Sequence, residues 1–282
     1  MQTDPSVSRH TEGGSVVALW RYPVKSMMGE ELNAAEVTER GIAGDRRFAV
    51  VDAATGKVAG AKNPRKWGNF FDFRAMYVQP REIGSKPVVR VTLPDGSFVT
   101  SDQPDATRVL SSALGREVAL AQARPDGESS GAQAEEYWPD IEGLDYRDTV
   151  TDFELPAGTF FDLATVHLLT TATIDRLRSL YPEGRFEVRR FRPNIVVSTG
   201  TGREGFVEDA WVGRTVAIGD DVRLRITGPC PRCVMTTLAQ GDLPKDSGIL
   251  RAAAQHNHAN VGVYAEVAAG GTVRRGDAVT LA

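Results

Sequence analysis

Short segments of alternating or β-branched hydrophobic residues, each ended by Gly, Pro or Asp, dominate the first half of the chain. Such runs between turn residues predict strands. They are VVALWRY at 16–22, RRFAVVD at 46–52, VVRVTL at 88–93 and EVAL at 117–120. One helix interrupts them, beginning at Pro104 and ending near Gly115, with Ser101 or Asp102 placed to cap its first N–H groups. The first half is therefore predicted to be small β-sheet structure.

The second half combines two predicted helices, at residues 171–180 and 247–255, with strands between and after them. VAIGDDVRL at 216–224 and VRRGDAVTL at 273–281 share the pattern V-x-x-G-D-x-V-x-L, a tight Gly-Asp turn that leads into an alternating strand. Two such units favour a small, closed antiparallel barrel, because closure removes exposed strand edges. The predicted fold class is mainly β with a few helices.

Charge is unevenly distributed, and this suggests a boundary. Residues 126–154 carry ten Asp or Glu and one Arg, whereas the whole chain has a net charge of −4. We expect a disordered N-terminus (1–14), a β-barrel-like domain (15–125), an acidic connector (126–150) that is either solvated or docks a basic partner, and a second domain (151–282). The chain outside residues 126–154 is basic enough to bind an anionic small ligand, whereas nucleic-acid binding would need a more basic surface.

Composition narrows the class of protein further. With 282 residues, 41% of them hydrophobic and 25% charged, the chain is expected to be globular and water-soluble. It contains no run approaching the ~20 apolar residues that cross a bilayer, and MQTDPSVSRHTEGGS lacks the features of a secretory signal. We therefore expect a cytoplasmic protein without membrane association. Two cysteines cannot supply the four thiolates that an iron–sulfur cluster usually takes, so electrons must come from elsewhere.

Both cysteines lie in GPCPRCVMTT, residues 228–237, as Cys230-x-x-Cys233. A redox dithiol wants a helix N-terminus after the pair, but the β-branched residues that follow favour a strand. A zinc site would need His256 and His258, whose spacing matches no common structural zinc motif. From the residues alone, two interpretations stay open: both thiols are buried as small hydrophobes, or one is a working thiolate beside a bystander.

Six segments in order resemble the MOSC family, named for the C-terminal domain of molybdenum cofactor sulfurase, together with its N-terminal β-barrel domain. This family includes the mitochondrial amidoxime-reducing component and its bacterial relatives. The segments are WRYPVKSMMG (20–29), GDRRFAVVD (44–52), VHLLTTATIDRL (166–177), RRFRPNIVV (189–197), CPRCVMTTL (230–238), and GVYAEV with GDAVTL near the C-terminal end. The resemblance spans residues 15–282.

The resemblance implies a site for molybdenum cofactor between the two domains. Cys233 matches the metal-ligating cysteine of the family, and a soft thiolate suits this metal. Nearby Arg232 is expected to favour the ionised sulfur, with Cys230 as the bystander. The expected cofactor contacts are Lys25, Ser26, Arg46, Thr170, Thr171, Arg192, Asn194 and Tyr264, with Lys62 as a candidate where the family usually has Arg.

Four of these contacts also have a physical rationale. Lys25 and Ser26 can donate to phosphate oxygens at a strand end. The hydroxyls of Thr170 and Thr171 stand at a helix N-terminus, which attracts anions. His167 is expected to be a packed core residue rather than a catalyst, and the aromatic run 67–73 is likewise expected to be packing.

The function implied by the resemblance is a molybdenum-cofactor oxidoreductase that reduces small N-hydroxylated compounds. A separate flavin or iron–sulfur donor is then required, and the acidic segment could dock it. Two alternatives stay open. A sulfur carrier would hold a persulfide on Cys233 and needs a nucleophilic thiolate. A binding module would store or transfer the cofactor without turnover.

Overall fold

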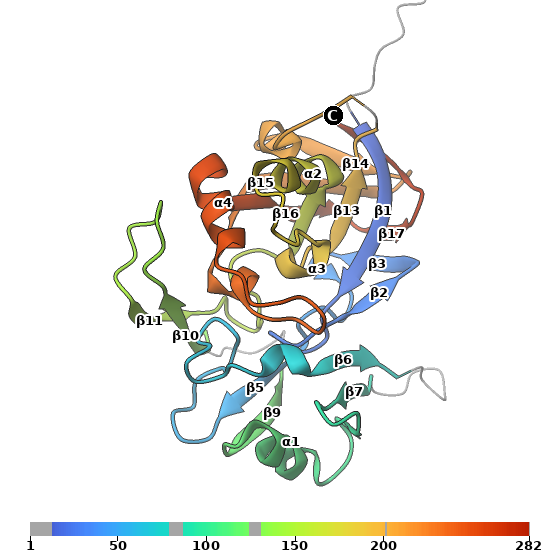
Figure 1. The fold of residues 1–282 in the computed structure, drawn as a ribbon. Coiled ribbons are helices and arrows are strands. Elements are labelled where there is room, and N and C mark those ends of the chain that lie inside the picture. The colour runs from blue at the N-terminus through green and yellow to red at the C-terminus, as the bar shows by residue number, and fades with distance from the viewer. Residues whose placement is uncertain (1–12, 79–86, 124–130, 201, 282) are drawn as a thin grey trace, which may run out of the picture.

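The computed structural model describes residues 13–78, 87–123, 131–200 and 202–281, and it is mainly β (Figure 1). A larger lobe holds the C-terminal strands and most helices, and a smaller lobe lies beneath it in the view of Figure 1. The expected disordered N-terminus falls outside the described residues up to position 12. Gly13 and Gly14 already belong to the first strand, β1 (Gly13–Arg21).

Seven strands close into a barrel in the larger lobe, within the part of the chain that is described. Pairing of β1 with both β13 and β18 completes the ring. The predicted barrel is confirmed, but it is not antiparallel throughout, because β12 and β13 pair in parallel. In ring order after β1, the strands are β13 (Ile195–Ser198), β12 (Val166–Thr170), β16 (Asn260–Ala269), β15 (Val222–Pro231), β14 (Thr215–Ile218) and β18 (Ala278–Leu281).

The repeated Gly-Asp pattern forms two neighbouring turns of this barrel. Gly219 (φ 56°) precedes β15, and Gly276 (φ 92°) precedes β18. Both glycines adopt the left-handed conformation, which has little energetic cost for a residue that lacks a Cβ atom. The two units are adjacent because β14 pairs with β18, placing Ile218 opposite Val279.

Small sheets build the rest of the first half. β5 (Phe48–Asp52) pairs with β9 (Val118–Gln122), and β6, β7 and β8 (Arg74–Tyr77, Val89–Thr92, Phe98–Thr100) form a meander. Short strands β2 (Glu30–Leu32), β3 (Ala34–Thr38) and β4 (Gly41–Ile42) join the two lobes, since β2 pairs with β1 and β3 pairs with β17 (Gly271–Arg274). The aromatic run 67–73 is packing, as expected: Trp67, Phe70, Phe71 and Phe73 are all buried in one core.

The helices lie where the sequence predicts them, with one addition and one error. The predicted helices correspond to α1 (Ala106–Leu114), α2 (Thr171–Leu180) and α4 (Gly248–Asn257). The structure adds a single helical turn, α3 (Val188–Phe191), and the 3-10 turns η1 (Phe70–Asp72), η2 (Val207–Trp211) and η3 (Val234–Thr237). The predicted caps of α1 are wrong. Ser101 instead accepts the Val89 N–H at 3.0 Å, and Asp102 accepts the Thr100 hydroxyl. No helix among the described residues is both long and apolar enough to cross a bilayer.

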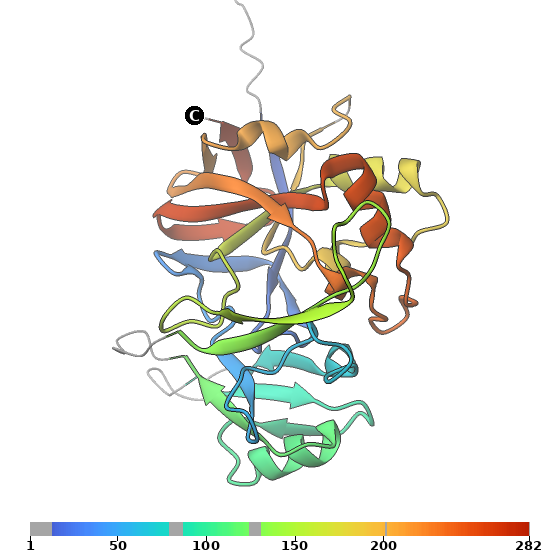
Figure 2. The same cartoon turned by 90° about the vertical axis from the view of Figure 1, so that its left-hand side faces the viewer.

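The predicted acidic connector is a hairpin that packs against the larger lobe. β10 (Gln133–Trp138) pairs with β11 (Thr149–Glu154), and the loop between them rises beside α4 (Figure 2). Ile141 and Leu144 of this loop pack against Leu250 and Ala254. Part of the acidic charge is neutralised locally, because Lys57 pairs with Glu135 and Asp152. The domain limits stay a prediction, but strand pairing crosses the expected boundary.

Candidate functional site

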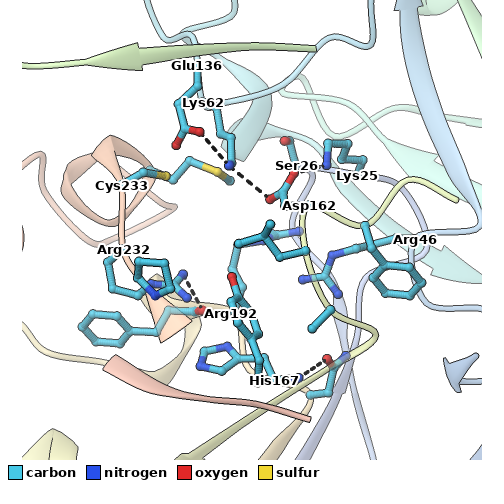
Figure 3. Close-up of a pocket in the computed structure, with 18 of the residues that line it drawn as sticks. Lys25, Ser26, Arg46, Lys62, Glu136, Asp162, His167, Arg192, Arg232 and Cys233 are labelled. Atoms are coloured by element: carbon cyan, nitrogen blue, oxygen red, sulfur yellow. Dashed lines mark hydrogen bonds and ion pairs between the residues drawn. The ribbon is translucent and has the colours of Figure 1, made fainter. Parts of the chain in front are cut away.

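A cavity of about 220 Å³ lies between the two lobes and collects nearly all of the predicted site residues. Five basic side chains and two carboxylates line it (Figure 3). The predicted residues on its wall are Lys25, Ser26, Arg46, Lys62, Arg192, Asn194, Cys233 and Tyr264. The wall also contains residues that were not predicted as cofactor contacts, among them Glu136, Trp138, Tyr146, Asp162, His167 and Arg232.

Lys25 and Ser26 reach the cavity from the loop after β1 and are buried, not a surface turn. The Lys25 ammonium donates to the Phe160 carbonyl at 2.9 Å and pairs with Asp162 at 2.5 Å. Burial lowers the pKa of Lys25, and Asp162 offsets part of this effect. Conversely, Lys25 and Lys62 hold the pKa of Asp162 well below its usual range, although burial alone would raise it. Asp162 therefore stays ionised between two lysines.

Three residues on the cavity wall adopt the left-handed backbone conformation: Ser26 (φ 65°), Arg46 (φ 46°) and Arg192 (φ 54°). This conformation is uncommon for residues other than glycine, and it is concentrated where a structure holds functional side chains. Arg192 ends α3, so its unusual backbone turns the chain from the helix toward β13. The strain therefore marks the same wall that carries the cations.

Arg192 is buried and only partly satisfied. Its Nη1 donates to the Met27 carbonyl at 2.7 Å, and its guanidinium carbon lies 4.1 Å from the centre of the Tyr22 ring. Its Nη2 is buried without a hydrogen-bond partner among the described residues. Burial lowers the pKa of Arg192 to about 10. A buried cation that lacks an anionic partner is costly, so this donor marks the place for an anion.

Asn194 lines the cavity but uses its amide to join the lobes. Its side-chain N–H groups donate to Asp45 at 2.9 Å and to the Trp20 carbonyl at 3.3 Å, and its side-chain oxygen accepts the backbone N–H of His167 at 3.1 Å. Asp45 also forms an ion pair with Arg46. Asn194 therefore positions this wall, with its own hydrogen bonds already used.

Cys233 contributes the thiol at the cavity wall, whereas Cys230 is fully buried. Burial raises the pKa of Cys233 to about 12. The expected influence of Arg232 falls mainly on the other cysteine, because its Nη1 lies 2.7 Å from the Cys230 sulfur. Residues Val234–Thr237 form the 3-10 turn η3, so the strand predicted after the cysteines is wrong.

Lys62 lies at the same end of the cavity as Cys233. Its ammonium forms ion pairs with Glu136 at 3.0 Å and with Asp162 at 3.5 Å (Figure 3). Although burial opposes it, Asp162, Cys233 and Glu136 together raise the pKa of Lys62. Lys62 therefore keeps its charge and lies between two carboxylates.

His167 and Tyr264 form the wall near the buried cysteine. Their rings meet edge to face with centroids 6.1 Å apart. His167 is packed in the core, as expected, and its Nε2 lies 3.1 Å from the Val261 carbonyl oxygen, but one side of it also lines the cavity. Burial and the charge of Cys230 raise the pKa of Tyr264, so its hydroxyl keeps its proton.

Thr170 and Thr171 are not among the residues that line the cavity, and their role as ligand contacts stays a prediction. Thr170 caps α2 as expected, accepting the Thr173 N–H, but it is fully buried. Its hydroxyl donates to Glu208 at 2.5 Å. The hydroxyl at this helix N-terminus is therefore bonded to a buried carboxyl group of the chain itself.

Protein ligands for a metal are sparse in the cavity. Within residues 13–78, 87–123, 131–200 and 202–281, no group of three or more His, Cys, Asp or Glu side chains is arranged to hold a metal ion. His256 and His258, considered for zinc, are exposed near the end of α4.

The structure thus combines a barrel closed by an N-terminal strand with a cationic cavity that contains one thiol on its wall, and family models match both halves of the chain. Residues 157–280 match the MOSC domain, and residues 13–138 match the MOSC N-terminal beta barrel domain. The chain belongs to the MOSC family.

Curated relatives within this family carry a more specific name. The chain is 26% identical over 253 residues to mitochondrial amidoxime reducing component 2 of Rattus norvegicus, covering 84% of this chain and 69% of that protein. It is 26% identical over 245 residues to the same component of Bos taurus, with 80% and 66% covered. Among solved structures, the YUAD protein from Bacillus subtilis aligns with a TM-score of 0.47 at 11% identity, covering 95% of each chain.

Proposed function

We propose that this protein is a molybdenum-cofactor-dependent reductase of N-hydroxylated compounds in which Cys233 is the protein ligand of molybdenum. Membership of the MOSC family and similarity to amidoxime reducing components support this class of activity. The single observation that carries the proposal is the combination, in one cavity, of the accessible Cys233 and the unpartnered buried Nη2 of Arg192.

The residues of the cavity fit an anionic, sulfur-rich cofactor. Its phosphate would supply the acceptor that Arg192 Nη2 lacks, and Arg guanidinium is well suited to such oxygens. Lys25, Ser26 and Arg46 come from the other lobe, so the headgroup would be held between the lobes. The Cys233 thiol has a pKa of about 12 and would lose its proton when it binds metal.

When bound, the cofactor supplies the two-electron chemistry that breaks the N–O bond. The substrate then takes up two electrons and two protons, and the oxygen leaves as water. The electrons come from a separate flavin or iron–sulfur donor. The chain's own residues fix the cofactor, keep one thiolate at the metal, and retain the charge of Lys62 beside Cys233. We also propose a cytoplasmic location.

A sulfur carrier is disfavoured by the environment of Cys233. Persulfide chemistry needs a nucleophilic thiolate at neutral pH, but burial keeps this thiol protonated. A module that binds the cofactor without turnover would use the same cavity. Reduction of a hydroxylamine by an artificial reductant separates the enzyme from the module.

The test uses protein produced in a host that makes molybdenum cofactor. We expect wild type to contain near-stoichiometric molybdenum and pterin and to reduce hydroxylamine. Cys233→Ala should abolish reduction. Arg192→Met should lower cofactor affinity about tenfold or more, because a charged hydrogen bond contributes roughly 1.5–3 kcal/mol.

Arg108→Ala is the matched control for Arg192→Met, because Arg108 is an exposed arginine on α1. It should retain full molybdenum content and full activity. Unchanged turnover in Cys233→Ala would exclude that residue as the ligand. Full occupancy in Arg192→Met would exclude the proposed anion site.

A further inference from the structure

Trp138 and Tyr146, here termed the aromatic wall, form the part of the cavity that the cofactor residues leave unexplained. We propose that the aromatic wall is a substrate subsite and that the protein prefers N-hydroxylated substrates carrying a planar aromatic group. The inference rests on the proposed function. It assigns the substrate class to two side chains that are partly exposed in the cavity.

Strand alternation places the aromatic wall near the thiol. Glu136 and Trp138 are two residues apart on β10 and so share one face of the strand. Glu136 reaches toward Lys62 beside Cys233 (Figure 3). Trp138 and Tyr146 line the same cavity as Cys233. A ring on the aromatic wall is therefore close to the reacting end of the cavity.

The two rings are held before any ligand arrives. Their centroids lie 4.7 Å apart with an interplanar angle of 60°, and Trp138 Nε1 donates to the Thr151 hydroxyl at 2.7 Å. The loop that carries Tyr146 is anchored where Ile141 and Leu144 pack on α4. Preorganised aromatic side chains lose little entropy on binding, which favours affinity for a flat ring.

Charge distribution separates the aromatic wall from the anion site. The charges nearest to it are already paired, because Glu136 binds Lys62 at 3.0 Å. Lys25 and Arg46 are likewise paired, with Asp162 and Asp45, whereas Arg192 Nη2 has no hydrogen-bond partner among the described residues. Leu163 also lines the cavity and adds an apolar side chain that is 67% exposed. An uncharged aromatic group therefore suits the aromatic wall, whereas the phosphate of a pterin suits the unpartnered Nη2 of Arg192.

The test compares two amidoximes of different shape, benzenecarboxamidoxime and acetamidoxime, with cofactor-loaded protein. In Trp138→Ala, the ratio of kcat/KM for the aryl over the alkyl compound should fall about tenfold, because aromatic pairs add to the simple burial of area. Tyr146→Ala should lower this ratio as well. Trp138→Phe should largely retain it, and Phe98→Ala, an exposed aromatic on β8 of the smaller lobe, should match wild type.

A second measurement needs no turnover. Titrating benzenecarboxamidoxime into loaded protein without reductant should quench tryptophan fluorescence in wild type but not in Trp138→Phe. If wild type reduces neither amidoxime, the proposed function fails while this titration still decides the subsite. An unchanged ratio together with unchanged quenching would overturn the subsite. Loss of molybdenum in Trp138→Ala would overturn it too, because the aromatic wall would then hold the cofactor.

Discussion

Cys230 is a buried thiol in a polar environment. Arg232 lies 2.7 Å from its sulfur, and His167 and Tyr264 form hydrogen bonds with it. Burial alone would raise the pKa of Cys230, but Arg232 and His167 outweigh it and lower this pKa to about 6. Contact with Arg232, which lines the cavity, therefore lowers the pKa of the residue expected to be a bystander.

This arrangement predicts a pH-dependent contribution to stability. A thiol whose folded pKa is depressed stabilises the fold fully above its unfolded pKa, near 9, and loses that contribution as pH falls toward about 6. The difference in unfolding free energy between wild type and Cys230→Ser should therefore shrink from pH 9 to pH 6. Urea denaturation across this range measures it.

Ultraviolet absorbance of the thiolate provides the control for this prediction. A titration centred near pH 6 should persist in Cys233→Ser, because the pKa of Cys233 is raised to about 12, and should vanish in Cys230→Ser. If the thiolate signal disappears in Cys233→Ser instead, the depressed pKa belongs to Cys233 and the prediction for Cys230 is wrong.

Site residues with short local motifs could be predicted from the sequence, and those defined by distant partners could not. Lys25, Arg192 and Cys233 lie in recognisable segments and do meet in one cavity. Asp162 pairs with Lys25 across 137 positions of sequence, without a local pattern that indicates it. The hydroxyl of Thr170 is likewise bonded to Glu208, 38 residues away, and no local pattern around Thr170 indicates this partner.

At the scale of elements, the N-terminus of α2 depends on a buried carboxylate. Glu208 of η2 accepts the hydroxyls of Thr170 at 2.5 Å and Thr173 at 2.7 Å and is fully buried. Burial raises the pKa of Glu208 despite these hydrogen bonds. The helix end therefore gains a polar partner that is costly to ionise.

This raised pKa predicts that the free energy of unfolding depends on pH. The carboxyl contributes most below its unfolded pKa, near 4.5, and the contribution is lost as pH rises through the folded value. Wild type should therefore lose stability relative to Glu208→Gln as pH rises above 4.5, as followed by urea unfolding at each pH. Parallel stability curves for the two proteins would contradict a raised pKa.

Elements with clear alternation were predicted well, whereas tertiary packing decided the others. The runs that became β1, β5, β7 and β9 carry their own signal. Val234–Thr237 contains β-branched residues but is wholly buried as the turn η3, because packing of this segment against the smaller lobe overrides strand propensity. The acidic charge of β10 and β11 concealed their pairing, which Lys57 stabilises from outside.

At the scale of the molecule, the two lobes share strands, core and hydrogen bonds. β1 completes the barrel of the other half, and Val234, Met235 and Leu238 pack into the core of the smaller lobe. Sequence periodicity predicted a barrel but could not specify this closure, since strand partners are chosen by tertiary contacts far apart in the chain. The lobes should consequently unfold together rather than as independent domains.

Two core substitutions test this coupling. Leu19 of β1 and Leu110 of α1 are both fully buried, in the barrel core and in the smaller lobe respectively. Replacing either by Ala should cost about 2–5 kcal/mol.

Fluorescence of variants that retain only Trp67, in the smaller lobe, or only Trp211, in the barrel, reports each core separately. If the lobes form one cooperative unit, each substitution lowers the urea midpoint of both probes equally, because global unfolding exposes both cores. A Leu19→Ala substitution that shifted the Trp211 transition and left the Trp67 transition in place would instead establish independent unfolding.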